Sequence, residues 1–566
     1  MRILLFTHAF NSLTQRLGAE LRQRGHEISV EFDIADSVTE EAVTLFRPDL
    51  IVAPYLRRAI PESVWSRHVC LIVHPGVVGD RGPSALDWAI DEGVPDWGVT
   101  VLQAEAEMDG GPVWASANFA LRSAKKSSVY RNEVTQAATL AVLQAVERFA
   151  TGSFVPQRPV GSDWRPLMKQ ADRAIDWQLD DTATVLRKIN AADGFPGVAD
   201  SLFGQPCHLF DACADATLRG APGEVIAQRD TALLRATCDG ALWLGHVKRA
   251  QSIKLPATLA FASELISVPH APLPGWWRAQ TPTWQDIAYE EADQVGYLHF
   301  EFYNGAMSTA QCDRLRAALA WAKQRPVRVL VLMGGHDFWS NGIHLGVIEA
   351  ASLAGGSAAD ESWRNINAMN DLALELITTE HQLTVAALGG NTGAGGCFLA
   401  RGADLVWARE ATLLNPHYKN MGNLYGSEYW TYSLPRRVGQ ETAHAIMRDR
   451  QPLTARRALE IGFTDACLPG DASTFGTAVA QRAAELAASP ELDAMIQAKR
   501  EVRTRDEAAK PLAAYRDEEL AHMRRNFYGF DPSYHIARHH FVHKSPMSWT
   551  PRHLARHRDP LIRVYP

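Results

Sequence analysis

The sequence predicts an α/β protein in which a doubly wound first domain and a small β-barrel precede a second α/β part. Over residues 1–125, apolar strand-like runs alternate with helical patterns, as in a doubly wound sheet. Residues 160–260 contain short β-like runs separated by turn residues, which suit a small barrel. Between residues 329 and 397, a strand followed by a glycine-containing loop occurs twice. These patterns predict the fold class and leave the chemistry open.

The first 75 residues carry the clearest signals for individual elements. Asn11 or Ser12 is placed to cap the first predicted helix, and Gly25 is placed to end it. The apolar face of this helix is formed by Leu13, Leu17 and Leu21. Strands are predicted at residues 3–6, 26–32, 50–54 and 70–73. No Gly-x-Gly-x-x-Gly follows the first strand, so we expect no dinucleotide cofactor.

Length and composition limit the classes of function. A chain of 566 residues is long enough for several domains. The net charge of −7 gives no reason to expect nucleic acid or an anionic membrane as a partner. No apolar run reaches the roughly 18 residues of a membrane span, and the N-terminus does not resemble a signal peptide. We therefore expect a cytoplasmic protein that acts on small molecules.

The seven cysteines are scattered and form no Cys-x-x-Cys pair. This distribution favours reduced, mostly buried thiols over disulfides or a zinc site. We expect no metal site from the sequence.

A histidine and an aspartate stand out in the first domain. His74 ends an apolar run, and Asp109 lies on a glycine-rich turn further along the chain. The residues alone leave two interpretations open: the two side chains meet at one catalytic cleft, or a core histidine and a turn-stabilising aspartate lie apart.

The same block resembles the 10-formyltetrahydrofolate-dependent formyltransferases, a family that includes the methionyl-tRNA formyltransferases. The matching residues occur in the family's order: His74, Arg81-Gly82, Gly98-Val99-Thr100 and Asp109-Gly110-Gly111-Pro112. The resemblance implies that His74 and Asp109 are catalytic and that Arg81 and Gly82 bind the folate co-substrate. Ile72 stands where the family has an asparagine that polarises the formyl carbonyl, which argues against ordinary formyl transfer to an amine or requires another donor.

Residues 160–260 resemble the C-terminal β-barrel of the same family. In tRNA formyltransferases this part helps to hold the nucleic acid. The negative net charge and the lack of a Lys/Arg cluster here argue against that role.

The glycine-rich stretch at residues 389–397 is followed directly by an apolar run. A glycine turn that opens onto a helix offers free N–H groups to a developing oxyanion. With the earlier loop at Gly342, this stretch resembles the crotonase (enoyl-CoA hydratase/isomerase) superfamily. The resemblance implies a crotonase-like α/β spiral fold, coenzyme A as cofactor, and oxyanion-hole N–H groups at Ile343 and Gly395. It also implies that Gly342 and Gly396 contact the cofactor.

A hydratase of this superfamily needs two carboxylates to add water across a double bond. The corresponding positions here are Phe398 and Tyr418, or His417 if the register slips by one residue. None of these is a carboxylate, so we expect no ordinary hydratase activity.

The order of the two halves resembles the HypX/HoxX family of hydrogenase-maturation proteins, and residues 413–432 resemble its crotonase-half signature. The resemblance implies that Tyr418 and Glu428 are catalytic. It also implies synthesis of CO from 10-formyltetrahydrofolate and coenzyme A, with other hydrogenase-maturation proteins as candidate partners. A formyl thioester has no α-carbon, so the remaining chemistry is loss of the formyl hydrogen and of the thiolate. The alternative to a catalytic role is an ordinary buried tyrosine for Tyr418 and a carboxylate at a helix N-terminus for Glu428.

We predict four segments: a formyltransferase-like domain at 1–155, the barrel at 156–265, a linker at 266–288, and a crotonase-like domain with a helical extension at 289–566. Prolines make the linker extended, and its three tryptophans pack it onto a neighbour. In the basic tail, Arg538 and Lys544 are candidates for the CoA phosphates, and the alternative is a solvated charged surface.

Two other functions remain open at this point. The first is a folate-dependent formyltransferase that uses another acceptor, with a separate acyl-CoA-binding half. The second is a non-catalytic scaffold that binds coenzyme A and folate.

Overall fold

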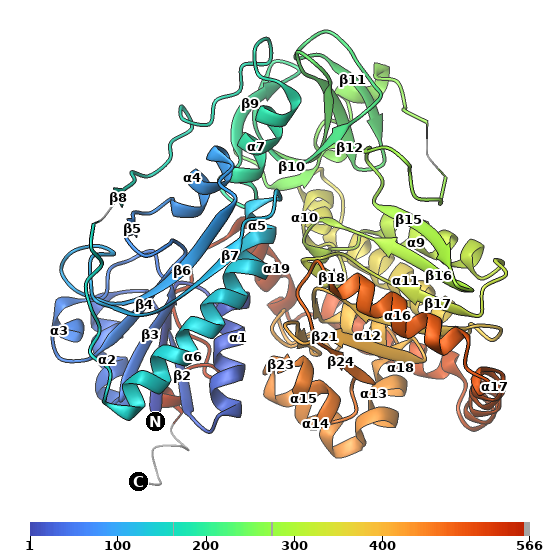
Figure 1. Cartoon of the computed structure of the whole chain (residues 1–566). Helices are drawn as coiled ribbons and strands as arrows, with labels where there is room; N and C mark the ends of the chain where they lie inside the picture. The colour runs from blue at the N-terminus through green and yellow to red at the C-terminus, as the bar shows by residue number, and fades with distance from the viewer. Residues whose placement is uncertain (162, 273–274, 560–566) are drawn as a thin grey trace. The chain divides into compact units, whose positions relative to one another are not determined.

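The computed structural model describes residues 1–161, 163–272 and 275–559 (Figure 1). Two residues of the predicted linker, Leu273 and Pro274, lie outside the described part. The chain forms two compact units. The first unit contains Met1–Ala212, Thr237–Asp239 and Pro546–Pro566, and the second contains Cys213–Ala236 and Gly240–Ser545.

A six-stranded mixed sheet forms the centre of the first unit, in the order β2-β1-β3-β4-β6-β7. The first four strands in this order run parallel, and β6 and β7 are antiparallel to their neighbours. Their bounds are β1 Arg2–Thr7, β2 Glu27–Phe32, β3 Leu50–Tyr55, β4 Cys70–His74, β6 Asp96–Gln103 and β7 Val113–Ala120. The predicted strands are therefore confirmed.

Helices cover both faces of this sheet, which confirms the doubly wound prediction. The helix α1 (Ser12–Gln23) packs with α6 (Thr135–Thr151) in one apolar cluster, and α2 (Asp36–Phe46) belongs to another. The side chain of Asn11 accepts the Thr14 N–H at 3.0 Å, as predicted for an N-cap. The three leucines of the predicted apolar face are fully or almost fully buried. Shorter elements of this unit are α3 Glu62–Trp65, α4 Ala85–Glu92, α5 Lys126–Val129, η1 Tyr130–Val134, β5 Asp80–Arg81, β8 Asp163–Trp164 and α7 Thr182–Ala192.

Short antiparallel strands follow, as predicted for the small barrel. In the first unit β9 (Val198–Leu202) pairs with the start of β10 (Gln205–Asp215). In the second unit consecutive antiparallel pairs join β11 to β12, β12 to β13 and β13 to β14. Their bounds are β11 Val225–Arg229, β12 Ala232–Ala236, β13 Ala241–Arg249 and β14 Lys254–Pro256, followed by α8 Ala257–Ala260 and η2 Glu264–Ser267.

The rest of the second unit repeats one supersecondary unit. Each turn has a strand of a six-stranded sheet, then a strand of a four-stranded sheet, then helix. The larger sheet is ordered β15-β16-β17-β19-β21-β24, and the smaller is ordered β18-β20-β22-β23. The repeats are β17 Val329–Leu332, β18 Phe338–Ser340 and α10 Leu345–Leu353; β19 Leu383–Leu388, β20 Asn391–Gly393 and α12 Gly395–Arg401; and β21 Leu405–Arg409, β22 Leu413–Asn415 and α13 Trp430–Val438.

Further elements of the second unit complete this spiral. Ser308 and Gln311 form a reciprocal capping box at the start of α9 (Thr309–Ala322). The other elements are β15 Ile287–Ala292, β16 Val295–Phe300, η3 Tyr303–Gly305, α11 Ala358–Ile377, α14 Gln440–Asp449, β23 Leu453–Thr454, α15 Ala455–Glu460, β24 Ala466–Leu468, α16 Phe475–Ala487, α17 Leu492–Ala509, α18 Leu512–Tyr528 and α19 Ser533–His543.

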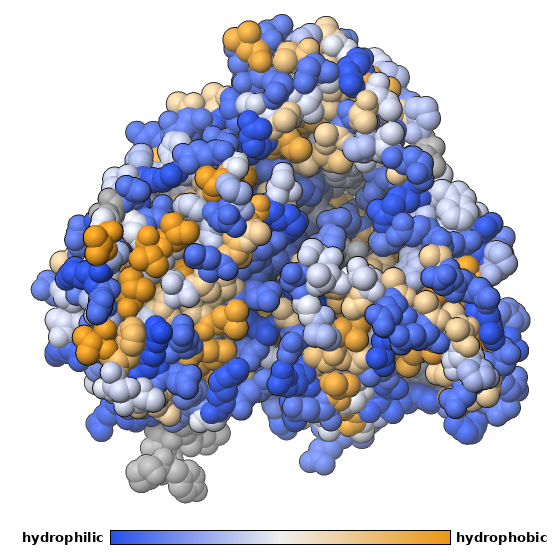
Figure 2. Space-filling model, viewed as in Figure 1, coloured by the Kyte–Doolittle hydropathy of each residue, from blue (hydrophilic) through white to orange (hydrophobic). Residues whose placement is uncertain are grey.

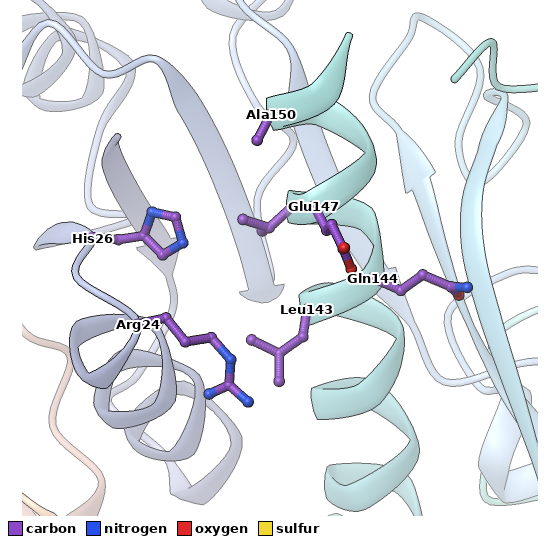
Figure 3. A pocket seen from close by; sticks show the side chains of 7 residues that line it. Arg24, His26, Leu143, Gln144, Glu147 and Ala150 are labelled. Atoms are coloured by element: carbon purple, nitrogen blue, oxygen red, sulfur yellow. The ribbon is translucent and has the colours of Figure 1, made fainter. Parts of the chain in front are cut away.

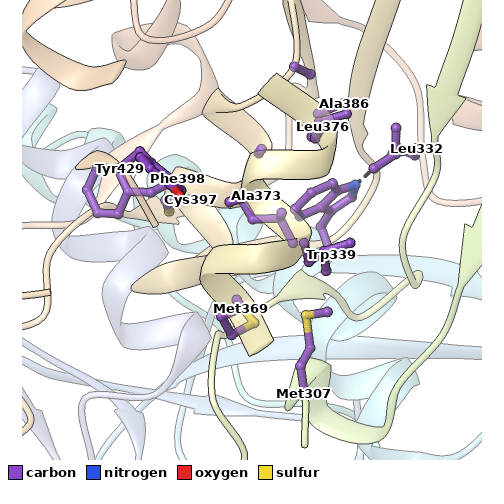
Figure 4. Packing of buried hydrophobic residues seen from close by; sticks show 14 of the residues in the cluster. Met307, Leu332, Trp339, Met369, Ala373, Leu376, Ala386, Cys397, Phe398 and Tyr429 are labelled. Atoms are coloured by element: carbon purple, nitrogen blue, oxygen red, sulfur yellow. Dashed lines mark hydrogen bonds between the residues drawn. The ribbon is translucent and has the colours of Figure 1, made fainter. Parts of the chain in front are cut away.

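Buried hydrophobic side chains from several elements of the spiral pack together in the core of the second unit (Figure 4). Trp339 is 1% exposed, and its indole N–H donates to the Leu332 carbonyl at 3.1 Å. Phe398, on α12, is completely buried in the same cluster. Burying a large apolar side chain such as Phe398 contributes about 1.5–3 kcal/mol, so this packing stabilises the core beside the glycine turns.

The C-terminal segment from Pro546 belongs to the first unit, whereas the sequence suggested that it continues the crotonase-like domain. Glu31 of β2 explains this placement, because a buried carboxylate needs donors. Thr550, His557 and Arg558 donate to it. His557 also lies 2.6 Å from the Ser29 hydroxyl. The last short helix of the described residues is η4 Arg556–Arg558.

The linker tryptophan Trp277 packs onto the second unit, edge-on to Tyr289 and Trp321 at 5.3 and 5.6 Å between ring centroids. On the face shown in Figure 2, hydrophilic residues predominate and hydrophobic ones are scattered. No helix among the described residues is both long and apolar enough to cross a membrane.

Candidate functional site

The first candidate site lies at the carboxyl end of β4. His74 is the last residue of this strand and is 4% exposed. Its Nε2 lies 2.8 Å from Asp80 Oδ2, and its Nδ1 lies 3.6 Å from Asp109 Oδ2. The structure therefore brings His74 and Asp109 together. Each ring nitrogen of His74 thus faces a carboxylate oxygen.

Asp80 is a partner of His74 that sequence reasoning missed. It lies six positions after His74 in the same glycine-rich stretch, and this short spacing is the signal that was available. Gly76 allows the contact, because a Cβ atom there would lie 2.4 Å from both His74 Nε2 and Asp80 Oδ2. The loop therefore requires glycine at this position.

Arg81 and Gly82 hold the turn that carries Asp109. The Arg81 guanidinium donates to the Met108 carbonyl at 2.8 and 3.0 Å and to Glu107 at 2.8 Å. The Gly82 N–H donates to Asp109 Oδ2 at 3.2 Å. These contacts position Asp109 beside His74, and folate binding by Arg81 and Gly82 stays a prediction.

Ile72 lies two residues before His74 on β4, so both side chains project from the same face of the sheet. An isoleucine there donates no hydrogen bond to a formyl oxygen. Any polarisation of that oxygen therefore depends on other groups.

The second candidate site lies where two glycine turns meet. Gly342 has a left-handed backbone with φ of 78°, and its N–H donates to the Ser340 hydroxyl at 3.1 Å. A Cβ atom on Gly342 would lie 3.2 Å from the Gly395 nitrogen, so the two backbones are in contact. Gly395 is the first residue of α12, where N–H groups have no acceptor within the helix. The N–H groups of Ile343 and Gly395 stay our predicted oxyanion donors.

Close packing shapes the second of these turns. A Cβ atom on Gly396 would lie 2.2 Å from the Ser340 carbonyl oxygen, so only glycine fits. Ala394, just before the helix, has a positive φ of 45°. Gly396 thus allows β18 to approach α12. Contact between Gly396 and a cofactor stays a prediction.

Glu428 reaches the Gly395 turn with its carboxylate. It is 1% exposed, and a Cβ atom on Gly395 would lie 2.5 Å from its Oε1. The Glu428 backbone has a φ of 59°, and its N–H donates to the Asn370 side-chain oxygen at 2.8 Å. Within the described part of the chain, Oε1 has no hydrogen-bond partner. A buried carboxylate oxygen without a donor therefore lies beside the predicted oxyanion hole.

Tyr418 forms a hydrogen bond with the second carboxylate oxygen of Glu428, Oε2. Its hydroxyl lies 2.5 Å from Glu428 Oε2 and 3.0 Å from the Ser427 carbonyl. Its ring stacks on Phe398, with centroids 5.3 Å apart and an angle of 17° between the planes. Phe398 and Tyr418, the two positions at which a hydratase would carry carboxylates, thus form an aromatic wall, and the carboxylate beside it is that of Glu428.

Burial raises the pKa of Glu428 to about 8; the hydrogen bond from Tyr418 opposes this shift and the charge of Glu519 adds to it. Glu519, on α18, accepts the N–H groups of Tyr429 and Thr431 at 3.0 and 2.9 Å. Burial raises the pKa of Glu519 to about 7. Sequence reasoning missed Glu519, which lies 90 residues beyond Tyr429.

The raised pKa of Glu428 predicts a pH-dependent stability. The folded state binds this proton more tightly than the unfolded chain, with a pKa of about 8 against 4.5. The contribution of Glu428 to the free energy of unfolding is therefore present below pH 4.5 and is lost as the pH rises toward 8. We expect Glu428→Gln to be more stable than the parent near pH 8, by an amount that shrinks toward pH 5. Urea midpoints at about pH 5 and about pH 8 measure this difference. A pH-independent difference would contradict the assignment.

The two basic candidates of the tail differ in their surroundings. Arg538 is 5% exposed and donates to Glu349 Oε2 at 2.8 Å, so it is an internal charge. Lys544 is exposed at the end of α19, with its ammonium 4.3 Å from the centre of the Phe541 ring. Phosphate binding by either residue stays a prediction.

A surface pocket in the first unit lies beside the end of α1 and the helix α6 (Figure 3). Its lining residues include none of the predicted site residues. They are Arg24, His26, Leu143, Gln144, Val146, Glu147 and Ala150.

Family models match both parts of the chain. The formyl transferase model matches residues 21–146, and the model of the formyl transferase C-terminal domain matches residues 167–264. The enoyl-CoA hydratase/isomerase model matches residues 297–552. The methionyl-tRNA formyltransferase of Paraburkholderia phymatum is 25% identical over 37% of this chain and 65% of that protein.

Two proteins match over nearly the whole length. Hydrogenase maturation factor HoxX of Bradyrhizobium diazoefficiens is 54% identical over 99% of this chain and 97% of that protein. The crystal structure of HypX from Aquifex aeolicus, in complex with tetrahydrofolic acid, superposes with a TM-score of 0.96. It is 48% identical, with 99% of both chains covered.

The fold and the comparisons define a two-part enzyme, with a formyltransferase-like part followed by a crotonase-like part. The chain belongs to the HoxX/HypX family of hydrogenase maturation factors.

Proposed function

We propose that this protein makes carbon monoxide for hydrogenase maturation in two steps. The first step transfers the formyl group of 10-formyltetrahydrofolate to the thiol of coenzyme A. The second converts formyl-CoA to CO and coenzyme A. We assign the first step to residues 1–155 with the barrel at 156–265, and the second to residues from 289 up to the C-terminal segment that belongs to the first unit.

In the first step the thiol sulfur attacks the formyl carbon, and the bond from that carbon to N10 of the folate breaks. The thiol loses a proton and N10 gains one, so the step is redox-neutral. His74 is placed to take the first proton and give the second. Asp80 and Asp109 stabilise the imidazolium that forms between the two transfers, because each lies beside one ring nitrogen.

In the second step Glu428 takes the formyl hydrogen as a proton. The electron pair of the C–H bond stays on carbon and becomes the lone pair of CO, while the C–S bond breaks and the thiolate leaves. The thiolate then receives the proton, so no oxidant is needed. The N–H groups of Ile343 and Gly395 polarise the thioester carbonyl, and Tyr418 keeps Glu428 in position through Oε2.

The unpartnered Oε1 of Glu428 carries this proposal. It lies beside Gly395 in apolar surroundings, and burial raises the pKa of the carboxyl to about 8. A carboxylate with such a pKa takes a proton more readily than one in water. Two alternatives make different predictions: a transferase with another acceptor makes no formyl-CoA, and a scaffold that binds coenzyme A and folate consumes neither.

The decisive experiment is incubation of the purified protein with coenzyme A and 10-formyltetrahydrofolate labelled with ¹³C in the formyl group. We expect ¹³CO in the headspace and no ¹³CO when coenzyme A is omitted. Labelled formyl transfer without CO would favour another acceptor, and unchanged folate would favour the scaffold. Either result would reject the proposal.

A further inference from the structure

Outside both sites, three potential metal ligands converge on one point in the second unit. His539 and His543 are four residues apart on α19, so they share one face of the helix. Both rings turn toward Glu349 of α10: His539 Nδ1 lies 2.9 Å from its Oε1, and His543 Nε2 lies 3.1 Å from the same oxygen. The two imidazole centroids are 4.1 Å apart.

These separations suit a shared metal ion. All three ligand atoms lie within 4.8 Å of one another. Zn²⁺ bonds to histidine and carboxylate are about 2.0–2.2 Å, so ligand atoms at the corners of a tetrahedron are about 3.4 Å apart. The observed distances are slightly shorter, and small rotations of the two rings would open them.

The three residues differ in exposure: Glu349 is buried, and the two histidines are partly exposed to solvent. The side chain of Glu349 is 5% exposed, whereas those of His543 and His539 are 30% and 55% exposed. The buried carboxylate is fixed, and the imidazoles are free to adjust on the solvent side. An ion from solution can therefore reach the cluster and keep water in its remaining positions.

The two oxygens of the Glu349 carboxylate have different neighbours. Arg538 donates to Oε2, which leaves Oε1 to the histidines. The guanidinium balances part of the carboxylate charge, so an ion here depends on the imidazoles for affinity.

We propose that Glu349, His539 and His543 form a binding site for a divalent first-row transition metal such as Zn²⁺, which ties α19 to α10. Two imidazoles and one carboxylate favour such ions over Mg²⁺ or Ca²⁺, which prefer oxygen ligands. The α10 helix directly follows the Gly342 turn, so the ion would also anchor the chain next to the oxyanion hole. Sequence patterns reveal metal ligands at short spacings. They could not reveal this site, because Glu349 and His539 are 190 residues apart in sequence.

The competing explanation is a hydrogen-bonded network in which each imidazole donates one N–H to Oε1. To distinguish the two, the metal-stripped full-length protein is titrated with ZnCl₂ by calorimetry, together with His539→Ala, His543→Ala and His540→Ala. The last variant is the matched control, because His540 is an exposed histidine on the same helix outside the cluster. We expect one equivalent of Zn²⁺ to bind to the parent and to His540→Ala. We expect at least about tenfold weaker binding in the other two variants.

A second measurement does not depend on the variants. Co²⁺ added to the stripped parent protein is expected to give visible d–d bands typical of nitrogen and oxygen coordination, and Zn²⁺ is expected to abolish them. Glu349→Gln is a poor test, because it leaves Arg538 buried without its carboxylate. Absence of the cobalt bands, or unchanged zinc affinity in both His539→Ala and His543→Ala, would overturn the proposal.

Discussion

Replacing Glu428 by Gln is expected to stop CO release while formyl-CoA accumulates. Glutamine keeps the shape of the side chain and can still accept the hydrogen bond from Tyr418. It cannot take the formyl proton, and loss of a general base costs typically 10²–10⁴-fold in rate, so we expect at least about a hundredfold decrease. Headspace CO and formyl-CoA, measured in the same reaction, test this expectation.

Two further variants sharpen this test. Glu441→Gln is the matched control, because Glu441 is an exposed glutamate in the same unit, on α14, and should leave CO release unchanged. Tyr418→Phe keeps the stacking on Phe398 and removes only the hydroxyl, so we expect a smaller decrease, of about tenfold, than with Glu428→Gln. If Glu428→Gln released CO at the parent rate, the assigned base would be wrong, whatever the first unit does.

Replacing His74 by Ala is expected to abolish formation of formyl-CoA from 10-formyltetrahydrofolate. The imidazole lies between Asp80 and Asp109, where we assign it to move a proton from the thiol to the folate nitrogen. We expect a loss of about 10²–10⁴-fold. Formyl-CoA formed per minute, followed by chromatography, measures the effect.

Decarbonylation of formyl-CoA supplied in the assay is the internal control for His74→Ala. Because His74 lies in the first unit and Glu428 in the second, CO release from supplied formyl-CoA should continue at the parent rate. Asp109→Asn keeps the shape of the turn and removes one negative charge, so we expect an intermediate loss of transfer. Full transfer activity in His74→Ala would contradict the assignment of the first step.

Local patterns were sufficient to predict many individual elements. The N-cap at Asn11 appears where the sequence predicts it, because a cap involves residues only three positions apart. The left-handed backbone at Gly342 is likewise a local property of glycine. Glu428 was singled out only through family resemblance, since its neighbours in sequence do not reveal which part of the fold its side chain faces.

Some parts of the sites were inaccessible to sequence reasoning. Asp80 lies in the same loop as His74, but its spacing alone does not show that its side chain turns toward the imidazole. Glu519 shifts the pKa of Glu428 from a different helix. Arg538 is an internal charge because Glu349 lies buried beside it.

The sequence by itself determined the α/β class, the alternation of elements, the caps and the two glycine turns. These features follow from interactions within a few residues and from the periods of 3.6 and 2 that helices and strands impose. Only the tertiary structure decided three sets of contacts. The Glu428 carboxylate lies beside Gly395, and Thr550 and His557 form hydrogen bonds with Glu31. Glu349 contacts two histidines of α19. These contacts join residues far apart in the chain. They form because buried charges must find donors when the whole core closes, a requirement that no local pattern records.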